Sequence, residues 1–301
     1  MKIAVMGAGA VGCYYGGMLA RAGNDVVLIA RPSRVDAIRE KGLYMETTGF
    51  REYVQVRAST EASAVAGAEL VLCAVKSPDT LSAADAIAPH IDPNAFVLSL
   101  QNGVDNADRL RERLKNPVAS AVVYVAAEMA GPAHVKHHGR GELVFGPTAV
   151  ERGFDKLFIA AGVPIEVSDN VIGSLWAKLI LNCVYNPLSA ITQLSYERVV
   201  AGEGAWDVMR DIADECLAVA KADGVAVEGD TWKAVERIAQ TVPTQLSSTA
   251  QDVALGKRTE IDYINGYVLR RGRALGVPTP VNRAMHSLVK LIEGRKPNFN
   301  N

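Results

Sequence analysis

A lysine and two asparagines interrupt the otherwise apolar run LWAKLILNCVYNPLSA at residues 175–190. Lys178, Asn182 and Asn186 recur at intervals of four, so on a helix they form one polar stripe. A protonated lysine can stabilise negative charge on a carbonyl oxygen and donate a proton to it, and amides can orient polar groups of a bound molecule. Taken singly, the lysine can reach water and each asparagine can satisfy neighbouring backbone. The three together favour a site, because burying them without partners is costly.

A second polar cluster lies in TQLSSTAQDVALGKRTEIDYING at residues 244–266. Ser248 and Asp252 are four residues apart, and Glu260 stands where the next helix should begin. A carboxylate at a helix start also complements the helix dipole. The spacing therefore leaves a capping role and a role in a site equally open for Glu260.

The N-terminal segment carries the pattern GxGxxG directly after an apolar strand at 2–6 and before a helical segment. In this context the pattern predicts a dinucleotide-binding turn rather than an ordinary glycine turn. The first glycine permits the tight turn, the second lets a pyrophosphate approach the backbone, and the third allows close packing of helix on strand. Free N–H groups at the helix start suit phosphate. The candidate cofactor contacts are Gly7, Ala8, Gly9, Ala10, Val11 and Gly12.

The residues after the second strand bear on which dinucleotide binds. An NAD enzyme normally carries Asp or Glu there, which binds the ribose 2′-hydroxyl. This chain has Ala30-Arg31-Pro32-Ser33-Arg34 instead. Because no carboxylate is present and Arg31 stands at that point, the sequence favours the 2′-phosphate of NADP(H). The alternative is a surface loop that happens to be basic.

Two further polar residues follow predicted strands, at the edge where open sheets bind ligands. Lys76 follows LVLCAV, and Asn102 follows VLSLQ. Each can be a solvated loop residue, with Asn102-Gly103 an ordinary turn. Both lie on the predicted rim that holds the dinucleotide, which favours a role in binding.

The periodicity of apolar residues changes along the chain. In the first half, near-continuous apolar runs alternate with amphipathic segments, which is typical of a doubly wound parallel sheet. The runs are KIAVM (2–6), DVVLIA (25–30), LVLCAV (70–75) and AFVLSL (95–100). Shorter segments that should extend or edge this sheet are 118–126, 134–138, 142–146 and 164–168. From about residue 170 only helical periodicity is present, in 170–194, 203–223, 230–241, 246–256, 259–275 and 280–294.

We therefore expect an α/β fold with two domains. A Rossmann-type, doubly wound NADP-binding domain is predicted over residues 1–168, and an all-helical substrate-binding and catalytic domain over 169–301. A helix that begins directly after the sheet domain should run along a cleft between domains, a preferred place for ligands. The stripe of Lys178 is expected to face that cleft, where hydride transfer to a carbonyl carbon would leave charge on the oxygen.

Composition limits the classes of function. With 301 residues and a formal net charge of -1, the chain suits two cores, and nothing suggests binding to nucleic acid or an anionic membrane. Four cysteines lack ligand spacing, and HxxHH at 134–138 lacks a carboxylate or cysteine to complete a set, so no metal is expected. No apolar stretch reaches about 20 residues and no leader pattern is present, so a cytoplasmic protein with reduced thiols is expected.

The chain resembles the ketopantoate reductase (2-dehydropantoate 2-reductase) family over nearly its whole length. The motifs that carry the resemblance are GxGxxG at 7–12, Arg31, Lys76, NG at 102–103, LWxKLxxNCxxNPLxA at 175–190, SSxxQD at 247–252 and TEIDYINGYVLRRGRALG at 259–276. The resemblance implies NADPH-dependent reduction of ketopantoate to (R)-pantoate, a step of pantothenate and coenzyme A biosynthesis. It implies a small 2-oxo acid as partner, and a homodimer is compatible with it.

The position of each residue in these motifs also implies its role. Lys178 would be the general acid, and Glu260 would bind the substrate hydroxyl or the nicotinamide end of the cofactor. Lys76 and Asn102 would lie on the cofactor side. The implied substrate contacts are Asn102, Lys178, Asn182, Asn186 and Ser248.

Two positions depart from the family pattern. Gln101 stands where some members have histidine, and Ser195-Tyr196 stands where some relatives present an asparagine that helps to bind substrate. The second departure bears on the substrate more than on the reaction. Two alternatives therefore stay open: an NADP-dependent reductase of another branched 2-oxo acid or β-hydroxy acid, and a non-catalytic NADP-binding protein.

Overall fold

The structure is a computed structural model that describes residues 1–294. The chain divides into two compact units, Met1–Val171 and Ile172–Asn301. The first unit carries the glycine-rich turn and the second carries nearly all of the helix with the polar stripe. The roles assigned to residues 1–168 and 169–301 stay predictions, because a division into compact units does not show what either one binds.

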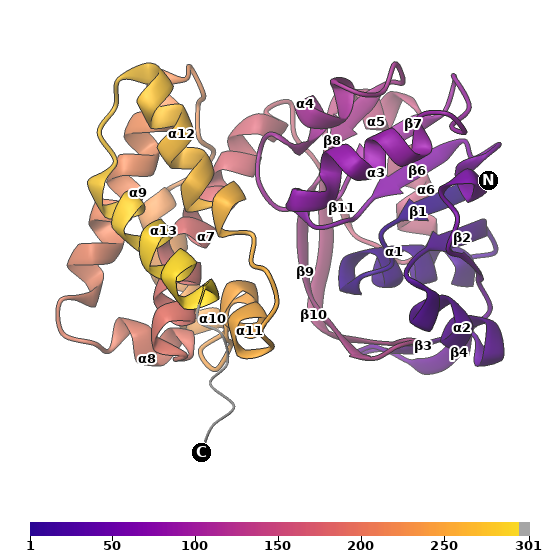
Figure 1. The fold of residues 1–301 in the computed structure, drawn as a ribbon, viewed down its shortest axis with the longest axis horizontal. Coiled ribbons are helices and arrows are strands. Elements are labelled where there is room, and N and C mark those ends of the chain that lie inside the picture. The colour runs from indigo at the N-terminus through magenta and orange to yellow at the C-terminus, as the bar shows by residue number, and fades with distance from the viewer. Residues whose placement is uncertain (295–301) are drawn as a thin grey trace. The chain divides into compact units, whose positions relative to one another are not determined.

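A parallel sheet forms the centre of the first unit (Figure 1). Its six strands run in the order β5-β2-β1-β6-β7-β8, and every neighbouring pair is parallel. The strands are β1 (Lys2–Met6), β2 (Asp25–Ile29), β5 (Arg57–Ser59), β6 (Leu70–Cys73), β7 (Phe96–Ser99) and β8 (Val118–Ser120). Strand β1 is central, and the chain leaves it first toward β2 and later returns to β6 on its other side. The switch point of the sheet therefore lies between β1 and β6.

Helices cover both faces of this sheet, because successive strand residues point to opposite sides. Ile3 and Val5 lie in one core cluster, whereas Ala4 lies in another. The helices are α1 (Ala10–Arg21), α2 (Pro32–Lys41), α3 (Thr80–Ile87), α4 (Asn106–Arg111), α5 (Pro147–Glu151) and α6 (Phe154–Ala160), with short 3-10 turns η1 (Ala62–Val65) and η2 (Ser77–Asp79). This arrangement confirms the predicted doubly wound fold of the N-terminal part.

A second sheet, which the sequence did not predict as separate, completes the first unit. It has the order β11-β10-β3-β4, with β9 paired to β10. Its strands are β3 (Leu43–Glu46), β4 (Arg51–Val54), β9 (Val122–Gly131), β10 (His134–Phe145) and β11 (Ile165–Val167). The expectation that the later segments extend or edge the first sheet is therefore wrong for all but 118–120. Residues 134–138 and 142–145 belong to one strand, because bulges on either side of Arg140 let the ladder to β9 continue.

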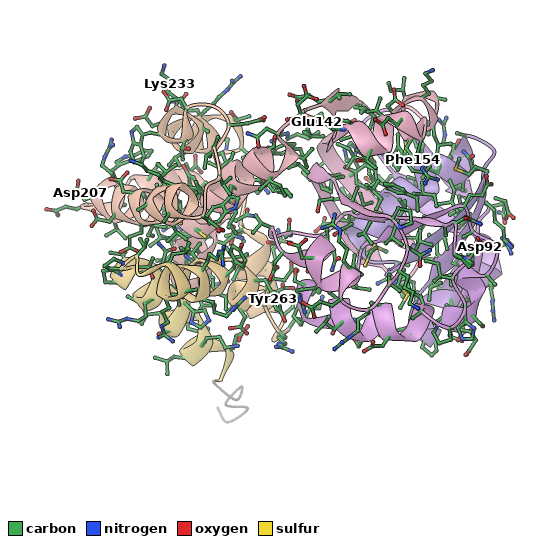
Figure 2. All side chains as sticks on the ribbon, turned by 90° about the horizontal axis from the view of Figure 1, so that it is seen from above. Asp92, Glu142, Phe154, Asp207, Lys233 and Tyr263 are labelled. Carbon is green, nitrogen blue, oxygen red and sulfur yellow. The ribbon has the colours of Figure 1, made fainter. Side chains whose placement is uncertain are left out.

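The second unit is helical, and the part that the structure describes contains no strand. Its elements are α7 (Val171–Thr192), α8 (Tyr196–Val200), α9 (Ala205–Ala222), α10 (Thr231–Thr241), α11 (Ser248–Ala254), η3 (Ile261–Tyr263), α12 (Asn265–Leu275) and α13 (Pro280–Glu293). Gly224 and Gly276 end α9 and α12, with φ of +74° and +71° just beyond each helix. Figure 2 shows Asp207 and Lys233 pointing outward from α9 and α10. The helical character predicted for this part is confirmed.

The predicted helix over 259–275 is interrupted. A 3-10 turn at Ile261–Tyr263 is separated from α12 by Ile264, whose ψ of -101° lies outside the helical range. Glu260 therefore precedes the short turn and is not in the first turn of the long helix. Its side chain makes no capping hydrogen bond there.

Candidate active site

The glycine-rich turn lies at the switch point, between β1 and α1. Gly7 has φ of +104°, and a Cβ placed on it would lie 2.6 Å from the backbone nitrogen of Val75, just beyond β6. A Cβ on Gly12 would collide with the carbonyl oxygen of Gly7. The N–H groups of Gly7 and Ala8 both donate to the Ile29 carbonyl at 3.2 Å, which fixes the turn against the end of β2. No side chain fits at either glycine, as the pattern predicts.

Gly9 has the opposite environment. A Cβ placed on it would meet no atom within 4 Å, and the residue is exposed. Gly9 is the N-cap of α1. The first N–H groups of a helix lack intrahelical partners, and Gly9 has no side chain that could bond them. Open space beside such groups is what a pyrophosphate requires, so the turn fits a dinucleotide. The side chain of Ala8 is buried in the core.

Arg31 stands at the end of β2, as the N-cap of α2. Its side chain is exposed. The neighbouring Arg34 is committed elsewhere, because its Nη1 donates to the Pro132 carbonyl at 2.7 Å. Arg31 is therefore the guanidinium that the strand end presents to solvent.

Lys76 and Asn102 follow neighbouring strands, and a buried polar network joins their two loops. Asn106, 2% exposed, donates to the Asn102 carbonyl at 2.6 Å and to Ser77 Oγ at 3.1 Å. Ser77 Oγ donates to the same Asn102 carbonyl at 3.0 Å. Thr80 donates to Asn106 Oδ1 at 2.9 Å. The backbone next to Lys76 and the backbone of Asn102 are thus held in one rigid assembly, with Lys76 exposed and Asn102 half-buried.

Gln101 belongs to the same assembly. Its Nε2 donates to the Val75 carbonyl at 3.1 Å and to Thr80 Oγ1 at 2.7 Å, and its Oε1 accepts from Ser99. The residue links the ends of β6 and β7 beside the glycine-rich turn. We did not predict this positioning role for Gln101, Thr80 or Asn106. The only local signal is the polar spacing of QNGxDN after an apolar strand.

The polar stripe lies on α7, which is one continuous helix over Val171–Thr192. Lys178 and Asn182 are half-buried, and Asn186 is 3% exposed. Ser247 Oγ donates to the Asn186 carbonyl at 3.3 Å and accepts from the Ala250 N–H, which caps α11. Since Ser248 is the first residue of α11 and is exposed, the structure brings its backbone beside the C-terminal part of the stripe.

Glu260 lies between two anchored residues. The Thr259 N–H donates to Glu293 Oε1 at 2.7 Å, and the Thr259 hydroxyl contacts the same oxygen. Asp262 pairs with His286 at 2.8 Å and with Lys290 at 3.0 Å. Glu260 itself is half-buried. Three residues of α13, His286, Lys290 and Glu293, therefore fix the chain on both sides of this carboxylate.

These anchors set the protonation of two carboxylates. Burial alone would raise the pKa of Asp262, but hydrogen bonds from His286 and Lys290, with the charge of Lys290, outweigh it and lower the pKa. Burial alone would also raise the pKa of Glu293. Hydrogen bonds from Lys290 and Thr259 outweigh this effect and lower the pKa. Both groups are held as anions at neutral pH.

The histidines of HxxHH go to separate partners. His134 pairs with Glu46 at 3.1 Å, His138 pairs with Glu128 at 2.9 Å, and His137 bonds the Arg140 carbonyl at 2.7 Å. Within residues 1–294, no three His, Cys, Asp or Glu side chains gather as a metal site would require.

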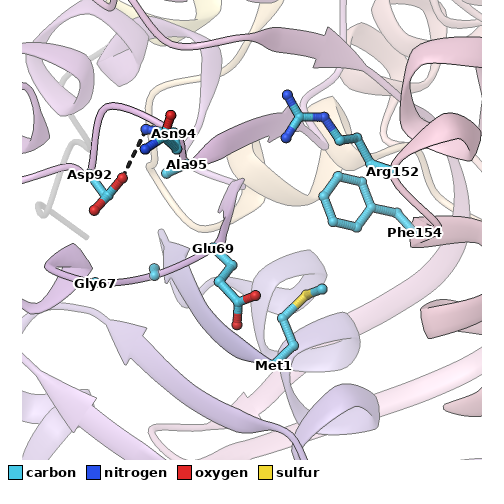
Figure 3. A pocket seen from close by; sticks show the side chains of 9 residues that line it. Met1, Gly67, Glu69, Asp92, Asn94, Ala95, Arg152 and Phe154 are labelled. Carbon is cyan, nitrogen blue, oxygen red and sulfur yellow. Dashed lines mark hydrogen bonds between the residues drawn. The ribbon is translucent and has the colours of Figure 1, made fainter.

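A cavity of about 360 Å³ lies at the amino ends of the parallel strands, away from the glycine-rich turn (Figure 3). Met1, Glu69 and Ala95, which precede β1, β6 and β7, line it together with Arg152 and Phe154. None of the residues predicted for the site borders this cavity. Among the described residues, no helix has the length and apolarity needed to cross a membrane.

Both parts of the chain match a known family. Residues 3–149 match the family model described as ketopantoate reductase PanE/ApbA, and residues 170–293 match the model of its C-terminal part. A 2-dehydropantoate 2-reductase of Pyrococcus abyssi (strain GE5 / Orsay) is 31% identical over 305 residues, which cover 98% of this chain and 100% of that protein.

Two solved structures share the fold over the whole length. A PanE/ApbA family ketopantoate reductase from Ralstonia eutropha JMP134 is 63% identical, with a TM-score of 0.95 over 97% of this chain and 98% of that chain. The ternary structure of D-mandelate dehydrogenase with NADH and anilino(oxo)acetate is 26% identical, with a TM-score of 0.89 over 97% of this chain and 98% of that chain. On the two family models and the full-length relatives, this chain belongs to the ketopantoate reductase family.

Proposed function

We propose that the chain reduces ketopantoate (2-dehydropantoate) to (R)-pantoate with NADPH, a step of pantothenate and coenzyme A biosynthesis. The observation that carries the proposal is the stripe of Lys178, Asn182 and Asn186 on one continuous helix, in a chain of this family. The relatives named 2-dehydropantoate 2-reductase support the same substrate. A cytoplasmic location is the setting we expect for this activity.

The choice of NADPH over NADH is part of the proposal. It is supported by the exposed Arg31 at the end of β2, where a carboxylate for the ribose 2′-hydroxyl is missing. The mandelate dehydrogenase structure contains NADH, so membership in this fold does not by itself decide between the two cofactors. The contacts we propose on the cofactor side are Gly7, Ala8, Gly9, Ala10, Val11, Gly12, Arg31, Lys76, Asn102 and Glu260.

The proposed chemistry assigns one proton transfer to the chain. NADPH, when bound, would supply the hydride to the 2-oxo carbon. Lys178 would donate its proton to the carbonyl oxygen as electrons move onto that atom, and would regain a proton from solvent afterwards. Asn182 and Asn186 would orient the polar groups of the substrate, with Asn102 and Ser248 as further contacts. Glu260 would accept a hydrogen bond from the substrate hydroxyl.

Replacement of Lys178 tests the assignment. We expect Lys178→Ala to bind NADPH as the wild type does and to lose at least about a hundredfold in kcat, measured by NADPH absorbance with ketopantoate. The matched control is Lys233→Ala, which removes an exposed lysine of the same unit that pairs with Asp230. Turnover in Lys178→Ala equal to that of the control would remove this lysine from its proposed role.

A second candidate, reduction of another branched 2-oxo acid, is favoured by one observation. The similar D-mandelate dehydrogenase structure holds anilino(oxo)acetate, an oxo-acid derivative that is not ketopantoate. Comparing kcat/KM for ketopantoate with that for phenylglyoxylate, the oxidised form of mandelate, separates the two candidates. If NADPH binds but no 2-oxo acid is reduced, the chain is a non-catalytic binding protein. Light scattering of the purified protein tests the homodimer.

A further inference from the structure

Helix α7 contains a proline in its interior, and this proline removes one backbone hydrogen bond. Pro187 has no N–H, so it cannot donate to the carbonyl four residues earlier, which is that of Cys183. The residue is buried, as is Cys183, so water cannot readily replace the missing donor. The Cys183 carbonyl must find a partner outside its own helix.

Asn265, the first residue of α12, supplies that partner. Its Nδ2 donates to the Cys183 carbonyl at 3.1 Å. The same nitrogen donates to Asn282 Oδ1 at 2.9 Å, so both of its hydrogens are used. Asn265 and Asn282 are both 0% exposed. The bond from Asn265 therefore replaces, from another element, the helix bond that Pro187 cannot make.

Asn282 is in turn held rigidly on α13. Its Nδ2 donates to the Ile212 carbonyl at 3.2 Å and to Glu215 Oε2 at 2.8 Å, and its own N–H donates to the same oxygen at 2.9 Å. Asn265 is thus oriented by a buried amide that cannot rotate without losing two bonds. The amide of Asn265 is preorganised to face the Cys183 carbonyl.

We infer that Asn265 is a positioning residue that connects the two segments carrying the proposed catalytic groups. Cys183 lies five residues after Lys178 on α7, and Asn265 lies five residues after Glu260. One hydrogen bond between Asn265 and Cys183 therefore fixes the Lys178 segment relative to the Glu260 segment. The inference rests on the proposed function for the roles of these two residues. The hydrogen bond itself does not depend on it.

The pairing of a helix proline with an external amide gives a direct test. If residue 187 is alanine, its N–H can donate to the Cys183 carbonyl, and the bond from Asn265 becomes redundant there. Asn265→Ala should then no longer displace the Cys183 segment. The loss of the second bond, to Asn282, is the same in both backgrounds and cancels in a double-mutant cycle.

The experiment compares wild type, Asn265→Ala, Pro187→Ala and the double variant with NADPH and ketopantoate. We expect Asn265→Ala to lower kcat by about tenfold or more, because displacement of a reacting group by a fraction of an ångström slows catalysis. The Kd for NADPH should change far less than kcat, since all the proposed cofactor contacts except Glu260 lie in the other unit. In the Pro187→Ala background, the same substitution should change kcat by less than about twofold.

Tyr185→Phe is the matched structural control. It removes another buried hydrogen bond of α7, from Tyr185 Oη to the Val235 carbonyl at 2.7 Å, and leaves the Cys183 carbonyl untouched. A loss of kcat in this control as large as that in Asn265→Ala would overturn the inference, because general loosening of α7 would then explain both. If Asn265→Ala cannot be purified folded, the double variant decides: a kcat far below that of Pro187→Ala contradicts positioning through Cys183.

The two hypotheses fail in different ways. Failure of the proposed function appears as wild-type protein without ketopantoate reduction, or as unimpaired Lys178→Ala. Denaturant unfolding then still measures whether Asn265→Ala lowers the free energy of unfolding less in the Pro187→Ala background than in the wild type. If the loss is equal in both backgrounds, the bond from Asn265 does not replace the helix bond that Pro187 lacks. Coupling in stability without coupling in kcat, in an active enzyme, overturns positioning and leaves a structural bond.

Discussion

Gly7 and Gly9 belong to the same turn, yet they face different constraints. Gly7 has positive φ and no room for a Cβ, whereas a Cβ on Gly9 would meet no atom of the chain. We predict that Gly9→Ala keeps the free energy of unfolding within about 0.5 kcal/mol of wild type. It should weaken NADPH binding at least about tenfold, because the methyl group occupies the space that a pyrophosphate needs.

Gly7→Ala is the contrasting variant. Its alanine would need a strained backbone and would meet the Val75 nitrogen, so we expect a loss of stability of about 1–3 kcal/mol or more. Denaturant unfolding and fluorescence titration with NADPH measure the two effects separately. Equal destabilisation by both substitutions, or unchanged cofactor affinity in Gly9→Ala, would contradict the assignment of the turn.

Replacement of Arg31 tests whether the chain prefers NADPH to NADH. We predict that Arg31→Ala raises KM for NADPH about tenfold or more, because a charge-assisted bond to the 2′-phosphate is lost. KM for NADH should change little, since that cofactor has no 2′-phosphate. Arg113→Ala, which removes an exposed arginine paired with Asp85, is the control. An equal rise of KM for both cofactors would show that Arg31 does not read the phosphate.

Residue types that local backbone geometry dictates can be predicted from the sequence. Gly7 and Gly12 were predictable because the turn and the packing of helix on strand leave no room for a side chain, whereas the approach of a pyrophosphate to Gly9 stays a prediction. Gln101 was noticed only as a departure from a family pattern. Its bonds to Val75 and Thr80 join residues 26 and 21 positions apart in the chain, and no local pattern encodes such contacts.

The same distinction holds for elements. The four central strands and the long helices were predictable, because each buries its own periodic set of apolar side chains. The second sheet was not, because β10 pairs with β3 at His134↔Tyr44, some ninety residues away in the chain. Polar residues HHGRGE in the middle of β10 suggested a break, whereas Gly139 and Gly141, both with positive φ, flank bulges that keep the strand continuous.

Replacement of Asn106 tests the hydrogen-bond network that joins the loops after β6 and β7. It bonds the loops that follow β6 and β7, so Asn106→Ala should release both Lys76 and Asn102 from their fixed backbone positions. We predict a loss of stability of about 1–3 kcal/mol together with a clear rise of the NADPH Kd.

Asn116 offers a matched control at the other end of the sheet. It too is buried, and its Nδ2 donates to two backbone carbonyls, those of Asp92 at 2.8 Å and Ala95 at 3.0 Å. Asn116→Ala should cost about as much stability but leave the NADPH Kd unchanged, by denaturant unfolding and titration. If the two variants weaken NADPH binding equally, the network around Asn106 does not position the cofactor contacts.

For the whole molecule, the sequence predicted two domains because the apolar periodicity changes once, at about residue 170. The compact units divide after Val171, and the family models meet in the same region, since one ends at residue 149 and the other starts at 170. Length alone favours two cores at this size. What periodicity cannot reveal is a polar network such as Asn265 with Asn282, whose partners lie on different helices and are chosen by tertiary packing.

The lowered pKa values of Asp262 and Glu293 predict how the stability of the chain changes at acidic pH. Asp262 and Glu293 have pKa values below their ordinary values of 3.8 and 4.5. A carboxyl group with a lowered pKa in the folded state stabilises the fold above its unfolded pKa, and this contribution is lost as the pH falls through the folded pKa. We therefore expect Asp262→Asn to be less stable than wild type at pH 7, by on the order of 1 kcal/mol because the pairs are partly exposed.

That difference should persist down to about pH 4 and shrink below it, as the wild-type carboxylate takes up a proton and loses its bonds from His286 and Lys290. Denaturant unfolding at pH 7, 5 and 3.5 measures it, with Asp207→Asn, an exposed carboxylate on α9, as the control. A gap between wild type and Asp262→Asn that stays constant or widens toward pH 3.5 would contradict the lowered pKa. Because Thr259 and Asp262 flank Glu260, the same loss should release that carboxylate, so ketopantoate turnover should fall in acid before the chain unfolds.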